Sequence, residues 1–438
     1  MRPDISNLDA YLGDGPLRAL FEKLYWCEAT TGTCQLPPRG RIVAHERFGS
    51  AEAVETQLVL RVQNRVTGEA ALFNRLRSAR PSTRVEQDIL AALGRRPEPA
   101  ECLFCKENFD EVTAREHYPR SAGAGEGYGE PETIAKRAAA PGGERIRGLR
   151  CTTTSNVAKY EGRHGVIVFD EHDPLAFSEE EVVDSFSVAR AWFLRMRDAG
   201  AYFPFLMWNC RWRGGASMEH GHLQVTMASR RHYPKVERLW EAASRYGGGE
   251  ARTYFENLFH IHRSLGLGFE VRSPTESCGS VRVMAHLTPF REKEVLVCSD
   301  LAFSASEEHA GPATARFASA VHGVLDALRG SLRVESFNLG VLIPPLSDDP
   351  AHQWPGFPTV CRIIDRLSVG ELPSDISGMG IFAGADAIAS DPYEVIEAIA
   401  RRFDANEKGS SVLSGLRATW RELVPPATGS ATQACASQ

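Results

Sequence analysis

The sequence predicts an α+β protein in which antiparallel sheets are flanked by helices and one strand–helix–strand unit occurs twice. The first observation is a repeat, because Leu175-Ala-Phe-Ser178 recurs as Leu301-Ala-Phe-Ser304, each just after an apolar run with strand character. The second observation is that each copy continues through a helical stretch to another strand, which passes through Asn209 in the first copy and Asn338 in the second. Matching context on both sides of a repeat indicates a duplicated fold.

Bulk composition narrows the class of protein. The chain has 438 residues, of which 43% are hydrophobic and 24% are charged, with a formal net charge of −6. This composition is typical of a globular protein, and the mild acidity argues against non-specific nucleic-acid binding. The N-terminus lacks a signal pattern, and no apolar run has the length needed to cross a membrane. We therefore expect a cytoplasmic protein whose ten cysteines are mostly free thiols.

Local patterns predict the domain organisation. We expect an N-terminal extension at 1–60, a first half at 61–230, a second half at 231–424 and a disordered tail at 425–438. Ser178-Glu-Glu-Glu181 has the form of a capping box, which starts a helix. The other expected elements are a short helix at 86–93, a flexible loop at 120–147, a helix at 179–198 and core strands at 165–170 and 203–208.

The stretch from Trp208 to Val225 carries the densest chemistry. His220, His222 and Gln224 alternate with Leu223 and Val225, so a β-strand would put the three polar side chains on one face. Such a row is costly to bury without partners. The Gly-rich loop just before it, which ends at Ser217, can bring backbone N–H groups towards a phosphate. The pattern predicts a phosphate-directed site, and the alternative is a polar sheet face exposed to water.

These residues resemble a known signature. Asn209, followed by Gly215-Ala-Ser217 and His220-Gly-His-Leu-Gln224, resembles the active site of galactose-1-phosphate uridylyltransferase, which belongs to the histidine-triad superfamily. The family usually has prolines where this chain has Glu219 and Gly221. The resemblance implies a duplicated histidine-triad fold. Only the first copy carries the His-x-His motif, because the second ends in Pro344-Pro345.

Cys102-Leu-Phe-Cys105 suggests a redox pair or half of a metal site. No thioredoxin-like context surrounds it, and no nearby pair completes a zinc finger. The resemblance implies that His172 and His220 complete a closed, structural zinc site with Cys102 and Cys105. His164 competes with His172 for this role, and the resemblance favours His172 because it follows a strand. Zinc on His220 would leave His222 free to react.

The resemblance also implies substrate contacts. Arg77 and Arg80 match an Arg-x-x-Arg-Pro turn that contacts nucleotide-sugar phosphates, partly across a dimer interface, which predicts a homodimer; a solvated basic loop is the alternative. Asn156 matches a nucleotide contact, although a plain turn asparagine fits nearly as well. Asn209 and Asp386 are the remaining expected contacts, and Asp386 lies in a weak match to the hexose-recognition segment. We expect no second metal, since 354–365 lacks the family's histidines.

The expected reaction is nucleotidyl transfer, with most weight on UMP moving from a nucleotide sugar to a sugar-1-phosphate. His222 would be the nucleophile, Gln224 a donor to a phosphoryl oxygen, and Ser217 a contact for the leaving phosphate. Glutamine cannot protonate a leaving group, as the third histidine of related hydrolases does, so phosphate leaving groups are favoured. The alternatives are a dinucleoside polyphosphate phosphorylase or hydrolase, a related enzyme acting on a specialised metabolite, and a non-enzymatic nucleotide-binding protein.

Overall fold

The computed structural model describes residues 2–79, 98–115, 145–246, 252–272, 279–304, 307–368, 377–406 and 412–424. Arg80, the expected helix at 86–93, most of the expected loop at 120–147 and the expected tail at 425–438 lie outside these ranges.

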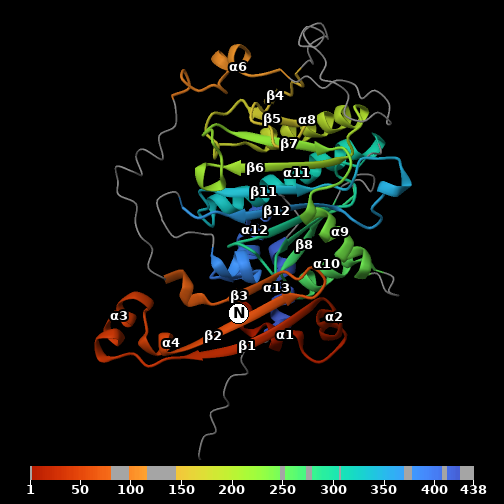
Figure 1. The fold of residues 1–438 in the computed structure, drawn as a ribbon. Coiled ribbons are helices and arrows are strands. Elements are labelled where there is room, and N and C mark those ends of the chain that lie inside the picture. Colours follow the sequence, from red (N-terminus) through yellow and green to blue (C-terminus); the bar gives the residue numbers. More distant parts are fainter. Residues whose placement is uncertain are drawn as a thin grey trace, which may run out of the picture.

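The centre of the molecule is a nine-stranded sheet in which every neighbouring pair of strands is antiparallel (Figure 1). In spatial order its strands are β4 (Cys151–Ser155), β5 (His164–Phe169), β7 (His222–Ala228), β6 (Phe203–Cys210), β11 (Phe337–Leu342), β12 (Thr359–Asp365), β10 (Val295–Ser299), β9 (Val281–Ala285) and β8 (Gly268–Val271). The expected strands at 165–170 and 203–208 correspond to β5 and β6.

The strand order shows the duplication directly. The order β4-β5-β7-β6 in the first half is repeated as β9-β10-β12-β11 in the second, and the two quartets meet where β6 pairs with β11. The connection between the first two strands of each quartet also matches. Asn156 N–H donates to the His164 carbonyl at 3.1 Å, and His286 N–H donates to the Glu294 carbonyl at 3.0 Å. The duplicated α+β fold expected from the repeat is confirmed.

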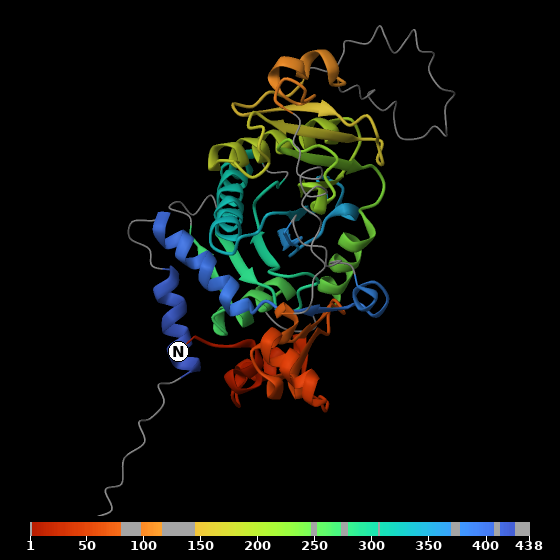
Figure 2. The same ribbon diagram turned by 90° about the vertical axis from the view of Figure 1, so that its left-hand side faces the viewer.

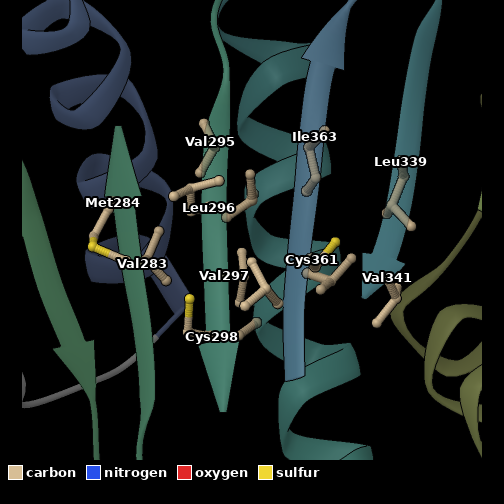
Figure 3. Packing of buried hydrophobic residues seen from close by; sticks show 14 of the residues in the cluster. Val283, Met284, Val295, Leu296, Val297, Cys298, Leu339, Val341, Cys361 and Ile363 are labelled. Atoms are coloured by element: carbon tan, nitrogen blue, oxygen red, sulfur yellow. The ribbon is translucent and has the colours of Figure 1, made fainter. Parts of the chain in front are cut away.

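Helices cover one face of this sheet (Figure 2). They are α8 (Glu179–Asp198), α11 (Glu307–Gly330) and α12 (Pro392–Asn406). α8 begins with the expected capping box, because the Ser178 side chain accepts from Glu181 N–H and the Glu181 carboxylate accepts from Ser178 N–H. On β6, Trp208 packs towards the helices, with its ring 5.0 Å from that of Phe177 before α8. Figure 3 shows the apolar side chains along β9, β10, β12 and β11 that form part of the core.

Alternation along the strands then puts Asn209, His222 and Gln224 on the face opposite Trp208. A second, four-stranded sheet lies near the β8 end of the molecule (Figure 1). In spatial order it contains β1 (Tyr25–Thr33), β2 (Thr56–Asn64), β3 (Ala70–Phe73) and β13 (Ala385–Ile388). β13 pairs in parallel with β3, which joins the C-terminal part of the chain to the N-terminal sheet. The domain boundaries at 60, 230 and 424 stay predictions.

The remaining elements surround these sheets. They are α1 (Leu8–Leu12), α2 (Pro16–Leu24), α3 (Pro38–Phe48), α4 (Ala51–Glu55), α6 (Lys106–Val112), α9 (Pro234–Tyr246), α10 (Tyr254–Ser264) and α13 (Val412–Leu423), with short helical turns at η1 (Ile5–Asn7), η2 (Arg75–Ala79), η3 (Trp212–Gly214), η5 (Pro350–His352) and η6 (Met379–Ala383). Among the described residues, no helix combines the length and the apolar character that crossing a membrane requires.

Candidate active site and metal centre

Four side chains from three separate parts of the chain meet at the β4 end of the large sheet. Cys102 and Cys105 lie just before α6, His172 follows β5, and His220 precedes β7. Their ligand atoms all lie within 4.8 Å of one another. His172 Nδ1 is 3.2 Å from His220 Nδ1, and the thiol-to-imidazole distances from Cys105 are 3.3 Å to His172 and 3.7 Å to His220.

The donor set fits a tetrahedral zinc ion. With Zn–N and Zn–S bonds of about 2.0–2.3 Å, neighbouring ligand atoms stand roughly 3.3–3.8 Å apart, and the cluster shows such spacings. His220 Nε2 lies 2.8 Å from the Phe169 carbonyl, so a proton on Nε2 leaves the Nδ1 lone pair for a cation. Burial raises the pKa of the Cys105 thiol to about 12, and a coordinated cation deprotonates a thiol. Cys102, Cys105, His172 and His220 therefore form a candidate zinc centre.

His164, the alternative ligand considered from the sequence, belongs to a different cluster. Its Nε2 lies 2.9 Å from Gln224 Oε1 and 3.1 Å from Asn156 Nδ2. The ring of Tyr160 packs on the His164 ring at 4.2 Å, and the Tyr160 hydroxyl donates to Gln224 Oε1 at 3.2 Å. His164 Nε2 can either donate to Gln224 or accept from Asn156, so the donor that the oxygen of Gln224 has with either tautomer is the Tyr160 hydroxyl. The amide N–H₂ of Gln224 is then left to donate elsewhere.

His222, the expected nucleophile, is 5% exposed at the start of β7. Its Nδ1 lies 2.8 Å from the His220 carbonyl, and a carbonyl only accepts, so Nδ1 carries the proton. Burial lowers the pKa of the His222 imidazole, which keeps the ring neutral. The lone pair of the neutral ring therefore lies on Nε2. The ring of Phe104, from the cysteine loop, stands edge-on to His222 at 5.6 Å.

The departures from the family signature have local causes. A Cβ on Gly221 would lie 2.8 Å from Phe169 Cδ2, so the packed phenyl ring excludes a larger residue between the two histidines. The Glu219 carboxylate accepts from Trp212 N–H at 2.9 Å and lies 3.7 Å from Arg211 Nε. These contacts close the loop that carries Ser217, whose side chain is exposed just before His220.

Asn156 stabilises the turn after β4 and also lies beside His164. Its Oδ1 accepts from Ala158 N–H at 2.8 Å, as a turn asparagine does, while its Nδ2 lies beside His164. Asn209 lies on β6, and its Oδ1 accepts from Asn338 Nδ2 at 2.7 Å. The β6–β7 register pairs Met207 with Gln224, so its continuation puts Asn209 opposite His222 on the same face.

Arg77 and Asp386 are brought together elsewhere. Both line a small cavity with Asp365, at the end of β12, and Arg291. Asp386 is engaged there, because its Oδ1 accepts from Arg291 Nη1 at 2.6 Å. β12 is three strands from β7 in the sheet order, which corresponds to roughly 14 Å. Within one chain, the cavity with Arg77 and Asp386 is separate from His222.

Three residues at the site were not expected from the sequence. Tyr160, Phe104 and Asn338 contact Gln224, His222 and Asn209 respectively. Asn338 had a usable signal, because the repeat had already aligned it with Asn209, and the strand register pairs the two residues. Tyr160 lies in a loop without periodicity, and only the pairing of β5 with β7 brings it to Gln224.

Comparisons with known proteins give a fold. No protein-family model matches the sequence, and no curated protein matches it. An ADP-glucose phosphorylase from Arabidopsis thaliana with bound ADP-glucose is similar in structure, with a TM-score of 0.52 and 12% identity over 77% of this chain and 97% of that chain. A galt-like protein from the same plant gives a TM-score of 0.51 at 12% identity, with the same coverage of 77% and 97%.

A structure described as a uridylyltransferase covers 67% of this chain and 96% of its own, with 13% identity and a TM-score of 0.48. At these identities a likeness establishes architecture and leaves the activity open. The chain therefore has the fold of the ADP-glucose phosphorylase and of the galt-like protein.

Proposed function

We propose that this protein is a nucleotidylyltransferase that moves a nucleoside monophosphate, with UMP as the preferred group, from a nucleotide sugar to a sugar-1-phosphate. The observation that carries the proposal is the tautomer of His222. Its Nδ1–H is held by the His220 carbonyl at 2.8 Å, and its Nε2 lone pair is free for attack on phosphorus. A neutral imidazole fixed in this orientation is suited to covalent catalysis.

The reaction runs in two displacements. His222 Nε2 forms a bond to the α-phosphorus while the bond from that phosphorus to the bridging oxygen breaks, and the sugar phosphate leaves as an anion. An oxygen of the acceptor phosphate then attacks the same phosphorus, and the phosphorus–nitrogen bond breaks. The oxygen of Gln224 accepts from the Tyr160 hydroxyl, so its N–H₂ donates to the transferred phosphoryl oxygens as charge shifts between them.

Gln224 also favours a phosphate leaving group. A carboxamide has no proton to give to an alkoxide or amine at neutral pH. A sugar phosphate or another phosphate is already a stable anion and leaves without this help. Transfer between phosphates is therefore favoured over hydrolysis of esters or amides.

In this proposal Cys102, Cys105, His172 and His220 hold zinc, and zinc stabilises the site without taking part in the reaction. Its ligand His220 carries the carbonyl that fixes the His222 tautomer. Residues of the cysteine loop, including Phe104, then remain packed against His222. The metal supplies rigidity at the nucleophile.

We further propose a homodimer. The cavity with Arg77 and Asp386 lies at least three strands from His222, roughly 14 Å, and an arginine side chain is too short to bridge that distance. A partner subunit's Arg77 turn, together with Arg80, would supply the phosphate-binding guanidinium groups that the site needs. Asn156 and Asn209 would contact the nucleotide from the same chain, and Ser217 the leaving phosphate.

One observation favours a second candidate. Asp386, the expected hexose contact, is ion-paired with Arg291, and Ala385 stands where the family has a tyrosine. A weaker hexose site would suit a dinucleoside polyphosphate phosphorylase or hydrolase, or an enzyme acting on a specialised metabolite, since these do not require hexose recognition.

Product analysis separates these functions. The protein is incubated with UDP-glucose, ADP-glucose or diadenosine tetraphosphate, each with galactose-1-phosphate, with inorganic phosphate or with no acceptor. The proposal expects transfer from UDP-glucose to galactose-1-phosphate. Release of ADP from the dinucleotide with inorganic phosphate would favour the alternative. Turnover of no donor under any condition would contradict both functions.

A further inference from the structure

Three polar side chains form a directed chain of hydrogen bonds between the two halves of the sheet. Arg366, just after β12, donates to Asn338 Oδ1 on β11. Asn338 Nδ2 then donates to Asn209 Oδ1 at 2.7 Å and to the Gly214 carbonyl at 2.6 Å. Asn338 and Asn209 are direct partners in the β11–β6 register, at the junction of the two halves.

The chemistry of the two ends fixes the direction of the chain. A guanidinium has only donors, so the oxygen of Asn338 faces Arg366 and its N–H₂ faces the other way. The Gly214 carbonyl has only lone pairs, which independently requires the N–H₂ on that side. The oxygen of Asn209 is consequently occupied, and its own N–H₂ must point away from Asn338.

Asn209 is a neighbour of His222, the proposed nucleophile. The β6–β7 register puts Asn209 opposite His222, and side chains at opposed positions on one face of a sheet are direct neighbours. Gln224, two residues along β7, also has its oxygen occupied by the Tyr160 hydroxyl. Two amide side chains thus neighbour His222 on this face of the sheet, and each has an N–H₂ left to donate.

We propose that Arg366 and Asn338, which belong to the half without the His-x-His motif, are positioning residues for Asn209. They hold its carboxamide with the N–H₂ towards the α-phosphate oxygens and its oxygen away from them. The inference rests on the proposed function, because it assigns a phosphate as the ligand. The second half of the fold, which lacks the His-x-His motif, would then contribute to the reaction at the first half.

The hydrogen bonds from Arg366 through Asn338 to Asn209 form a relay, and changing one atom of Asn338 should reverse its direction. In Asn338→Asp the carboxylate keeps its contact with Arg366 but has no N–H for Asn209. Asn209 then turns to donate to the new carboxylate and presents its oxygen to the phosphate. A hydrogen bond to a charged group is worth about 1.5–3 kcal/mol, so we expect kcat/KM to fall by roughly 10- to 100-fold.

Variants at Arg366 test the direction from the other end. Lysine also has only donors, so Arg366→Lys should keep kcat/KM within about 3-fold of wild type. Arg366→Met removes one of the two groups that orient Asn338 and leaves the Gly214 carbonyl, so it should give a smaller loss than Asn338→Asp. The matched control is Asn257→Asp, because Asn257 on α10 also donates its amide to a single side chain, Tyr246, at 3.2 Å. This control should leave the kinetics unchanged.

A double-mutant cycle decides whether Asn338 acts through Asn209. Asn209→Ala removes the donor, so adding Asn338→Asp to it should cost nothing further in kcat/KM. The same cycle is measured on equilibrium binding of UMP, which needs no chemistry, and each variant's thermal unfolding is recorded. Independent, additive losses in kcat/KM and UMP binding, or losses that simply follow the unfolding temperature, would overturn the relay.

The outcomes separate the relay from the proposed function. If wild type reacts with a donor or binds UMP and Asn338→Asp matches it, the relay is wrong and the function stands. If wild type neither reacts with any nucleotide donor nor binds UMP, the proposed function fails, and the role given to the relay fails with it.

Discussion

The carboxamide of Gln224 illustrates how single residues define this site. The alternation along 220–225 predicted its strand face, which the structure shows, but not the orientation of its amide. That orientation comes from the Tyr160 hydroxyl, which reaches Gln224 only after β5 pairs with β7. His164 could not be placed from the sequence for the same reason. From the sequence, His164 was the alternative to His172 as a zinc ligand. In the structure His164 lies beside Gln224 and is not in the metal cluster.

The first prediction concerns the donor on Gln224. In Gln224→Glu, one carboxylate oxygen still accepts from the Tyr160 hydroxyl, and the other faces the phosphate in place of an N–H. Removing one donor to developing charge typically costs about 10²–10³ in kcat, and we expect a loss of that order with little change in unfolding temperature. Tyr160→Phe is the matched control and should cost only a few-fold, because the N–H₂ of Gln224 is still present to donate. A Gln224→Glu enzyme within 3-fold of wild type would contradict the assignment.

A second prediction concerns Gly221, between the two histidines. A Cβ there would lie 2.8 Å from Phe169 Cδ2, so Gly221→Ala forces the ring or the strand to move. Overpacking of this kind costs about 1–3 kcal/mol of stability. In a Phe169→Leu background the alanine should cost clearly less, as measured by urea unfolding of all four proteins. Equal costs in the two backgrounds would show that the contact does not exclude larger residues.

At the scale of elements, the sequence predicted best where the signal was local. The capping box of α8 and the strands around the histidines needed only neighbouring residues. The pairing of β13 with β3 was not predictable, because it joins segments more than 300 positions apart and each strand has only four residues. The metal cluster stands between these cases. The Cys-x-x-Cys spacing indicated its two cysteines, and the family resemblance indicated His172 and His220. The fold brings all four residues together.

The third prediction concerns the element that holds the metal, the loop from 98 to α6. We expect one zinc per chain in the purified protein. Cys102→Ser should lose it, since a closed tetrahedral site needs all four ligands. Protease cleavage within 98–115 should then become faster, as the loop loses its anchor to His220. Cys151→Ser, a buried cysteine outside the cluster, should retain the metal. Elemental analysis of the three proteins checks this, and zinc retained by Cys102→Ser would refute the ligand set.

At the scale of the whole molecule, buried charge joins the two sheets. Arg362 on β12 donates to Glu294 at 2.6 Å and to Glu69, just before β3, at 2.5 Å. No sequence pattern indicated this link, because the three residues are far apart in the sequence. The residues around each of them also do not distinguish it from a charged residue on the surface. The overall duplication was predictable, since it repeats short-range patterns. The docking of the N-terminal sheet depends on long-range contacts.

The fourth prediction concerns the acid stability of the whole fold. Burial lowers the pKa of His262 to about 3 and of His232 to about 4. Both values lie below the unfolded value of about 6.5, so the unfolded chain takes up protons first. Stability is therefore full above pH 6.5 and falls as the pH drops towards 3–4, by about 1.4 kcal/mol per pH unit for each histidine.

His262→Leu tests this linkage, because it removes one of these titrating groups. In urea unfolding, the stability of the variant should fall with pH less steeply than that of wild type below about pH 6, by about 1.4 kcal/mol per pH unit, and the two slopes should agree above pH 6.5. The absolute stability of the variant does not enter the comparison. An unchanged slope would mean that His262 is protonated in the folded protein or shielded in the unfolded one.

Intact-mass measurement shows whether His222 carries a nucleotidyl group during the reaction. Wild type and His222→Ala are exposed briefly to UDP-, dTDP-, ADP- and GDP-sugars and quenched before mass measurement. We expect a gain of one nucleoside monophosphate on wild type only, largest with a UDP-sugar, and its removal when a sugar-1-phosphate is added. No adduct with any donor on zinc-loaded wild type, or an equal adduct on His222→Ala, would mean that His222 is not the nucleophile.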